Sequence, residues 1–242
     1  MKSPKAIETA PVILAFEAST KQLSVAVYVN ECVQAMEKIE APFGQAAELV
    51  PLAIRTLADV GLGFSSLSHV AAGCGPGSFT GLRVSLAAAK GVCLAQDIIG
   101  LGISGLEALA FSSSAFLNGL PVLCISDTRR GNVYAQLFAS DMTPQSTIFE
   151  AQIDQLPLLV SESICADGLM LAGFGGLAAK MAFAANGLAA TPVSFGNKQD
   201  TIIVDAGMIA TMAAKKIMLG DFPPLIPLYV ADPHLGPKKS GL

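Results

Sequence analysis

A chain of 242 residues is long enough for one large domain or for two lobes that share a core. The composition is 52% hydrophobic and only 14% charged, which excludes a disordered polar chain and predicts that a partner covers part of the surface. The formal net charge is −4, and the basic residues pair only at 129–130, 215–216 and 238–239. Strong binding of nucleic acid by this chain alone is therefore not expected.

Cysteine usage and the N-terminus indicate a cytoplasmic protein. Five widely spaced cysteines form neither a disulfide framework nor a CxxC metal clip. No apolar signal core follows the opening residues MKSPKAIETAPV. The uncharged stretch Ala108–Ser126 contains serine, glycine and proline turn signals, so no membrane span is expected.

The first half of the chain predicts strands that alternate with helices. Short runs rich in β-branched residues indicate strands, and apolar residues at three- and four-residue spacing indicate helices. Pro51 lies inside the first helical window and favours a later start for that helix. The expected elements are strands Val12–Phe16, Leu23–Val29 and Cys32–Ile39, a helix Gln45–Val60, a strand His69–Gly73, a helix Leu82–Ala95, a strand Ile98–Ile103 and a helix Gly105–Phe116.

The second half gives weaker signals, and the overall order of elements predicts an α/β protein. Residues 1–10 and 231–242 are expected to be tails, the latter mobile. The expected elements are strands Pro121–Ser126, Asn132–Phe138 and Leu169–Ala172, a helix after the glycines at 173–176, a helix Asp205–Leu219 and a proline-rich run Phe222–Tyr229.

The segment GCGPGSFTGLR, residues 73–83, is the sharpest local pattern. Its glycines and proline predict a tight turn between a strand and a helix, because glycine adopts positive φ without steric cost. Such a loop before a helix could hold an anion, or it could be a structural turn that packs strand against helix. No Gly-Lys-Ser/Thr follows, which excludes a Walker A loop. The loop residues of interest are Gly75, Gly77, Ser78, Thr80 and Gly81, with Ser78 or Thr80 placed to cap the helix.

The helix expected at Leu82–Ala95 is apolar on two sides. One stripe consists of Leu82, Leu86, Ala89 and Cys93, and the other of Val84, Ala88, Val92 and Ala95. A surface helix normally has one apolar face. The helix is therefore either buried within its lobe or shared with another chain, and the residues alone favour neither.

Five segments, in order, resemble the TsaB (YeaZ) family. They are ILAFEAST at 13–20, GPGSFTGLR at 75–83 followed by AAAKG, SGLEALA at 104–110, DTRRGNVY at 127–134 and PLY at 227–229. The resemblance implies a two-lobed actin-like, sugar-kinase-like ATPase fold with ribonuclease H-like lobes. The first lobe would span 11–108, and a smaller, degenerate second lobe would span 109–230.

The resemblance also implies a function. The family member would be a non-catalytic partner subunit of the complex that places threonylcarbamoyl on the adenosine next to the tRNA anticodon. It would pair with TsaD, act together with TsaE, form a homodimer when alone and meet tRNA only through the complex. The implied partner surface lies on two helices and contains Leu49, Ala53, Leu57, Leu82, Val84, Ala88, Val92 and Ala95.

Departures from the family pattern argue against chemistry by this chain. Glu17 replaces the usual aspartate, only Glu48 remains of an H-S-E stretch, and Asp127-Thr128-Arg129 replaces the Asp-x-Gly that offers backbone to phosphate. Weak nucleotide or phosphate contacts are predicted at most from Ser19, Thr20, Asp127 and Arg129. The Arg129-Arg130 pair could face an acidic partner or phosphate, or be a solvated hairpin tip.

Histidine content excludes the metal site of TsaD-like proteins, which use an HxxxH pair on a helix. This chain has only His69 and His234, far apart in sequence. No metal, cofactor or catalytic residue is therefore predicted. The rival interpretations are an active small-molecule kinase of the same superfamily and a glycoprotease-like peptidase, and both lack a visible constellation of catalytic residues.

Overall fold

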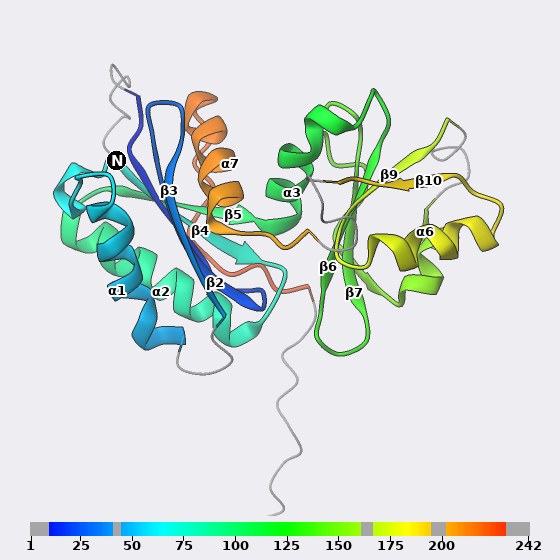
Figure 1. Ribbon diagram of the computed structural model, residues 1–242, viewed down its shortest axis with the longest axis horizontal. Helices are drawn as coiled ribbons and strands as arrows, with labels where there is room; N and C mark the ends of the chain where they lie inside the picture. The colour runs from blue at the N-terminus through cyan, green and yellow to red at the C-terminus, as the bar shows by residue number, and fades with distance from the viewer. Residues whose placement is uncertain (1–9, 41–44, 161–166, 195–201, 231–242) are drawn as a thin grey trace, which may run out of the picture.

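The computed structural model describes residues 10–40, 45–160, 167–194 and 202–230, which form two lobes side by side (Figure 1). Each lobe contains a five-stranded sheet, and the two sheets have the same strand order. The first is β3-β2-β1-β4-β5, and the second, counted from the matching edge, is β8-β7-β6-β9-β10. In both, the first three strands form an antiparallel meander, and the last two add in parallel. This repeated order confirms the predicted α/β class and its ribonuclease H-like lobes.

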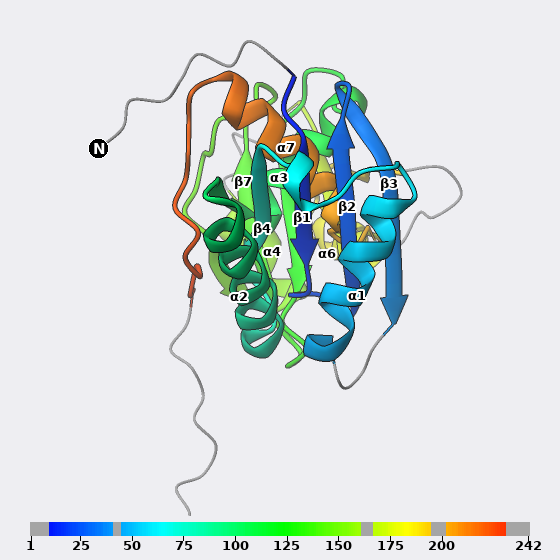
Figure 2. The same ribbon diagram turned by 90° about the vertical axis from the view of Figure 1, so that its left-hand side faces the viewer.

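The first lobe is built from long elements. Its strands are β1 (Ile13–Glu17), β2 (Gln22–Val29), β3 (Cys32–Glu40), β4 (His69–Gly75) and β5 (Ile99–Ser104). Its outer helices are α1 (Gln45–Ala58) and α2 (Phe79–Gln96), with a single 3-10 turn, η1 (Phe64–Ser66), between α1 and β4. Figure 2 shows α1 and α2 together on the outer face of this sheet.

The second lobe is shorter in nearly every element. Its strands are β6 (Val122–Asp127), β7 (Val133–Phe138), β8 (Phe149–Ala151), β9 (Leu169–Gly173) and β10 (Ala190–Pro192). Its helices are α4 (Leu156–Leu159) and α6 (Gly176–Ala185), with the 3-10 turn η3 (Ile153–Gln155) before α4. Two further helices, α3 (Gly105–Ser113) with its 3-10 extension η2 (Ser114–Phe116) and α7 (Ala206–Met218), lie between the sheets.

Three apolar cores follow from this layering. The first outer core joins α1 and α2 to the first sheet, and the second outer core joins α4 and α6 to the second sheet. The central core joins α3 and α7 to the inner faces of both sheets. Residues that alternate along one strand therefore enter different cores, as Ile13 and Leu14 of β1 do.

The C-terminal part of the chain returns to the first lobe. Helix α7 packs on β1 and β2, and the segment Phe222–Tyr229, named here the C-terminal strap, runs past β5 to the end of β4. The sequence placed both in the second lobe, 109–230. The division into two lobes at residue 109 stays a proposal. Such a division has to account for the packing of α7 and the strap on the first sheet.

Several element boundaries differ from the sequence expectation for local reasons. Helix α2 begins at Phe79 instead of residue 82, because the Ser78 side chain accepts a hydrogen bond from the Gly81 N–H and caps the helix earlier. Helix α1 begins at Gln45 and keeps Pro51 inside it. The short elements β8, β10 and α4 were missed, since three or four residues carry too little periodicity to be read.

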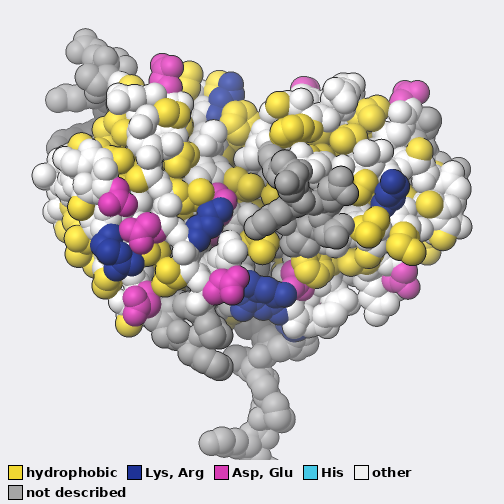
Figure 3. Space-filling view, viewed as in Figure 1, with side chains coloured by type: hydrophobic (Ala, Val, Ile, Leu, Met, Phe, Trp, Pro, Cys, Tyr) yellow, Lys and Arg dark blue, Asp and Glu magenta, His cyan; other side chains and the backbone are white. Residues whose placement is uncertain are grey.

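Charged side chains are sparse on the visible face of the molecule, and hydrophobic side chains reach the surface over both lobes (Figure 3). Within the described ranges, no helix is both long and apolar enough to span a lipid bilayer. The tail predicted at 231–242 lies outside the described residues.

Candidate functional site

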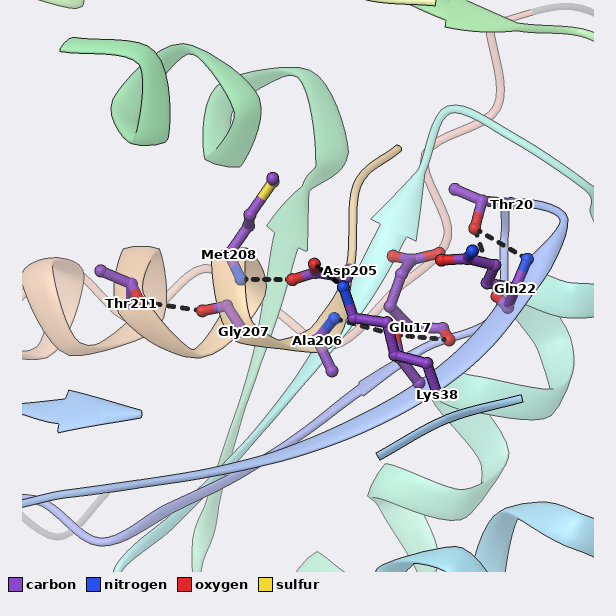
Figure 4. A network of polar contacts seen from close by, with 10 residues as sticks. Glu17, Thr20, Gln22, Lys38, Asp205, Ala206, Gly207, Met208 and Thr211 are labelled. Atoms are coloured by element: carbon purple, nitrogen blue, oxygen red, sulfur yellow. Dashed lines mark hydrogen bonds and ion pairs between the residues drawn. The ribbon is translucent and has the colours of Figure 1, made fainter. Parts of the chain in front are cut away.

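The candidate site lies where the first turns of the two lobes face each other. The β1–β2 turn carries Ala18–Lys21, and the β6–β7 turn carries Thr128–Asn132. The glycine-rich loop between β4 and α2 and the start of α7 complete the surroundings. Figure 4 shows the polar network at the first-lobe side of this site.

Glu17, the last residue of β1, is a buried carboxyl group with one unsatisfied oxygen. Ser19 donates both its backbone N–H and its hydroxyl to Oε1 at 2.5 Å. Among the described residues, Oε2 has no hydrogen-bond partner. Burial raises the pKa of Glu17 to about 7, against the opposing hydrogen bonds from Ser19, and the nearby charge of Asp205 adds to the rise. Glu17 therefore holds a proton over much of the acidic range.

Gly73 makes room for this carboxyl group. A Cβ atom at Gly73 would lie 1.7 Å from Glu17 Oε2. The longer glutamate, where the family pattern has aspartate, thus fits because its neighbour on β4 has no side chain. Glu17 was identified from the sequence as a departure from the family pattern, but no local pattern indicated that it packs against Gly73.

Asp205 ties the start of α7 to the first sheet. Its Oδ1 accepts the Met208 N–H at 3.0 Å and caps the helix, while Oδ2 lies 2.6 Å from Lys38 Nζ. The Ser24 hydroxyl accepts the Ala206 N–H at 2.9 Å. In Figure 4, Lys38 and Asp205 point toward each other, with Glu17 beside them. The ammonium group of Lys38 therefore neutralises the carboxylate of Asp205.

Lys38 and Asp205 were missed by sequence reasoning. They are 167 positions apart. Lys38 lies in a charged edge strand, where polar and apolar residues alternate as in other strands. Asp205 was predicted only as the first residue of a helix. No local signal connects them, so only the fold could bring them together.

The glycine-rich loop is filled by the protein's own chain. A Cβ at Gly77 would lie 2.7 Å from the Ser19 carbonyl oxygen, and one at Gly81 would lie 1.8 Å from the Ala18 carbonyl oxygen. The Ser78 N–H donates to the Ser19 carbonyl at 2.8 Å. The loop glycines thus allow the backbone of the loop to pack on the backbone of Ala18 and Ser19. This packing supports the interpretation of the loop as a structural turn and not as an anion site. Ser78 is the cap, and Thr80 is exposed.

The cleft between the lobes is small and bridged. It encloses about 150 Å³, whereas ligand pockets typically measure about 300–1,000 Å³. Arg129 donates from its guanidinium group to the Thr20 carbonyl oxygen, and Lys21 Nζ lies 3.8 Å from Asp127 Oδ2. Both contacts join the first turn of one lobe to the first turn of the other. The cleft is lined by Thr20, Lys21, Ile125, Ser126, Asp127, Arg129, Phe174, Ile202, Ile203 and Val204.

Arg129 adopts the backbone conformation that a glycine would favour. Its φ is 61°, and its N–H donates to Asp127 Oδ1 at 2.7 Å. The Arg130 guanidinium instead donates to the Tyr134 hydroxyl at 3.1 Å. The two arginines therefore separate, with Arg129 lining the cleft and Arg130 held along β7. Of the four predicted contact residues, Thr20, Asp127 and Arg129 meet at the cleft, and Ser19 lies under the glycine-rich loop.

The Ser19 hydroxyl lies beside the carboxyl group of Glu17, a pairing the sequence did not reveal. A serine beside a base is the minimum arrangement for nucleophilic catalysis. Ser19 is only 6% exposed, however, and its hydroxyl faces the loop at Gly77, where a Cβ would come within 2.9 Å of it. A substrate could not reach it without displacing that loop.

The described residues contain no group of three or more His, Cys, Asp or Glu side chains arranged to hold a metal ion. His69 is the first residue of β4, and its Nδ1 lies 2.9 Å from the Ser68 hydroxyl oxygen. Its ring stacks on that of Phe222, with the ring centroids 6.1 Å apart. His234 lies outside the described residues. Burial raises the pKa of Cys74 to about 12 and also raises that of Cys124, so both thiols stay protonated and are poor nucleophiles.

The two outer helices divide the predicted partner residues into core and surface. Leu49, Ala53 and Leu57 are buried in the outer core of the first lobe, and Leu82 is buried beside Gly75, so all four serve packing within the chain and the proposed surface has to exclude them. Val84, Ala88 and Val92 are half-buried, and Ala95 is exposed. The exposed apolar residues that the sequence missed are Val50 and Ile54 on α1 and Leu94 on α2.

Two lobes of ribonuclease H-like strand order, with their first turns facing across a cleft, define the actin-like, sugar-kinase-like class of α/β proteins. Within that class, the chain belongs to the family described as TsaD: tRNA N6-adenosine threonylcarbamoyltransferase, which it matches over residues 44–191.

Curated relatives agree with this assignment. TsaB of Escherichia coli (strain K12), a tRNA threonylcarbamoyladenosine biosynthesis protein, is 30% identical over 122 residues, which are 50% of this chain and 52% of that protein. TsaB of Haemophilus influenzae is 28% identical over 160 residues, 63% of each chain. The matched region thus spans about half to two thirds of the length of these relatives. The resemblance to the TsaB (YeaZ) family is confirmed.

Solved structures show the same fold. YeaZ from Pseudomonas aeruginosa superposes with a TM-score of 0.71 at 20% identity, over 91% of this chain and 100% of that chain. A second crystal structure, of an uncharacterized Pseudomonas aeruginosa protein with similarity to peptidase YEAZ, gives 0.74 at 19% identity with the same coverage.

Proposed function

We propose that this protein is a non-catalytic partner subunit in tRNA threonylcarbamoyladenosine biosynthesis. It pairs with TsaD, works alongside TsaE, and meets tRNA only through that complex. When alone it forms a homodimer through the same surface. The role in tRNA threonylcarbamoyladenosine biosynthesis that its TsaB relatives carry in their names supports this proposal.

The observation that carries the proposal is the apolar surface of α1 and α2. Leu94 is 86% exposed and Ile54 53% exposed on adjacent helices. Gly91 lies in the middle of α2 with nothing within 4 Å of where a Cβ would be. Glycine at such a position costs about 0.5–1 kcal/mol relative to alanine. No contact with another described residue offsets that cost, whereas a second helix in close approach would.

The site supports the absence of chemistry. The cleft encloses only about 150 Å³, Arg129 lines it where the superfamily offers glycine, and Lys38 already neutralises Asp205. Ser19 is covered by the glycine-rich loop. Among the described residues, the peptidase interpretation lacks an accessible nucleophile with a base, and the kinase interpretation lacks the glycine that would offer backbone to phosphate at Arg129, so we place both below the subunit role.

The test is co-purification with TsaD from the same organism. Ile54→Glu and Leu94→Glu place a charge on the proposed surface, where burial without a partner is strongly unfavourable. We expect recovery of TsaD to fall at least tenfold, with circular dichroism unchanged. Met181→Glu on α6, an equally exposed apolar position of the second lobe, is the matched control and should pair normally. Normal pairing by both α1 and α2 variants would refute this surface.

A further inference from the structure

The C-terminal strap is built into the first lobe. The Gly102 N–H of the edge strand β5 donates to the Pro223 carbonyl at 3.1 Å. Further along, the Leu228 N–H donates to the Cys74 carbonyl at 2.7 Å. The strap is thus fixed at both ends, first to the sheet edge and then to the start of the glycine-rich loop.

Three glycines mark the path of the strap. A Cβ at Gly102 would lie 2.4 Å from the Pro224 carbonyl oxygen, and one at Gly75 would lie 2.9 Å from the Leu228 carbonyl oxygen. A Cβ at Gly100 would approach Leu225 Cδ2 to 3.0 Å. The sheet edge and the loop therefore have no side chains at the points where the strap crosses. Such a fit indicates a fixed element of the lobe.

The outer side of the strap continues the surface of α2. The ring centroids of Tyr229 and Phe79, the first residue of α2, lie 5.5 Å apart with the rings tilted by 35°. Arg83 Cζ lies 3.7 Å from the centroid of the Phe79 ring. Ile226 is 56% exposed and Tyr229 49% exposed. Figure 2 shows α1, α2 and the strap following one another across this side of the first lobe.

The charge of this surface is opposite to that of the whole chain. Helix α2 carries Arg83 and Lys90 and no acidic residue, whereas the chain has a net charge of −4. Both basic residues are exposed, and no carboxylate in the described ranges forms an ion pair with either. The surface is therefore apolar with a basic margin, which is complementary to an apolar helix bordered by carboxylates.

We infer that the C-terminal strap is part of the docking surface, with Ile226, Tyr229 and Arg83 contacting a partner helix whose margin carries carboxylates. This inference rests on the proposed pairing with TsaD and extends it beyond α1 and α2. Tyrosine and arginine are the residues that most often dominate binding energy at interfaces. The strap thus has two roles: its inner side holds the glycine-rich loop, and its outer side meets the partner.

A charge-swap pair at Ile226 tests the inference, because the two variants differ in the sign of the new charge. We would measure the Kd for TsaD by calorimetry for Ile226→Glu and Ile226→Lys. Facing carboxylates predict that Ile226→Glu weakens binding at least tenfold and that Ile226→Lys weakens it several-fold less. Arg83→Glu should also weaken binding at least tenfold, and Met181→Glu should bind as wild type. Equal unfolding midpoints in urea would show that the lobe is intact.

The outcomes separate this inference from the proposed function. If Ile54→Glu and Leu94→Glu abolish pairing while both Ile226 variants and Arg83→Glu bind as wild type, the strap is not part of the surface and the inference is overturned. If Ile226→Lys binds as weakly as Ile226→Glu, the acidic margin is refuted. If no variant on α1, α2 or the strap affects binding, the proposed pairing itself fails.

Discussion

The two lobes share a strand order and differ in what their first turns do. In the first lobe the start of the turn after β1 is buried, with Ser19 packed beneath the glycine-rich loop and Glu17 against Gly73. In the second lobe the turn after β6 is largely exposed and projects Arg129 across the cleft. In an active two-lobed ATPase both turns would present backbone to phosphate. Here one is closed by packing and the other is blocked by a side chain.

The difference extends to the helices that cover the sheets. Helices α1 and α2 have 14 and 18 residues, whereas α4 and α6 have 4 and 10, so among the described residues the long pair of outer helices belongs to the first lobe. The second lobe closes the central core through β6 and α3. In the proposed function, the docking surface lies on the outer helices of the first lobe, whereas the two turns that would face phosphate lie at the cleft between the lobes.

The largest effect is expected at the first-lobe junction between loop and turn. Gly81→Ala would place a Cβ 1.8 Å from the Ala18 backbone, which cannot move without displacing β1. We expect the free energy of unfolding, measured in urea, to fall by more than about 3 kcal/mol. This loss exceeds the usual overpacking penalty of about 1–3 kcal/mol. Gly91→Ala, on the exposed side of the same helix, should stabilise the isolated chain by about 0.5–1 kcal/mol. Equal effects at both glycines would contradict the packed-junction account.

Glu17 predicts a pH dependence of stability that belongs to the first lobe. Its folded pKa of about 7 exceeds the ordinary 4.5, so the folded state retains a proton that the unfolded state has released. Its contribution is therefore fully present below pH 4.5 and is lost as the pH rises to about 7. Each pKa unit corresponds to about 1.4 kcal/mol, which gives a loss on the order of 3 kcal/mol across this range. In Glu17→Gln this slope should disappear, and a slope equal to that of wild type would assign it to other groups.

A smaller effect on stability is expected where Glu17 packs against Gly73, and a second substitution should partly reverse it. Gly73→Ala forces a Cβ into the position of the Glu17 carboxyl group, and we expect a cost of about 1–3 kcal/mol. Glu17→Asp withdraws that group by one methylene, so the double variant should recover at least about 1 kcal/mol relative to Gly73→Ala. Purely additive destabilisation in thermal or urea unfolding would show that the two residues do not compete for space.

The cleft bridges predict the smallest effects. Arg129→Ala removes the contact to Thr20, and because exposed polar contacts contribute about 0–1 kcal/mol, the loss should stay within that range. Arg129→Gly removes the same contact and also relieves the positive φ, so it should be about 1 kcal/mol more stable than Arg129→Ala. Identical unfolding midpoints for the two variants would argue against a strained turn.

Sequence patterns were sufficient where the signal is local. The apolar runs of β1 and β2, the presence of a glycine-rich turn between β4 and α2 and the apolar stripe that includes Leu86 were read correctly, because periodicity and glycine spacing act within a few residues. The turn itself is shorter than predicted, since α2 begins at Phe79. The family motifs then supplied the two-lobed arrangement.

Patterns were insufficient where the fold joins distant segments. Lys38 meets Asp205, and Gly102 meets Pro223, across separations that leave no periodic trace. The assignment of Leu49 and Leu57 to the partner surface failed for a related reason: a helical stripe shows which residues share a face but not whether that face is covered by the same chain. Exposure had to come from the structure.

We propose that this chain is required for tRNA modification but performs no chemistry. The most direct measurement is threonylcarbamoyladenosine formation in a reaction of tRNA, the threonylcarbamoyl-adenylate synthase, TsaD and TsaE, with and without this chain, alongside ATP loss by the chain alone. We predict that omission abolishes product and that the isolated chain consumes no ATP above the buffer level. Full product without the chain, or ATP turnover that vanishes in Asp127→Ala, would contradict the account.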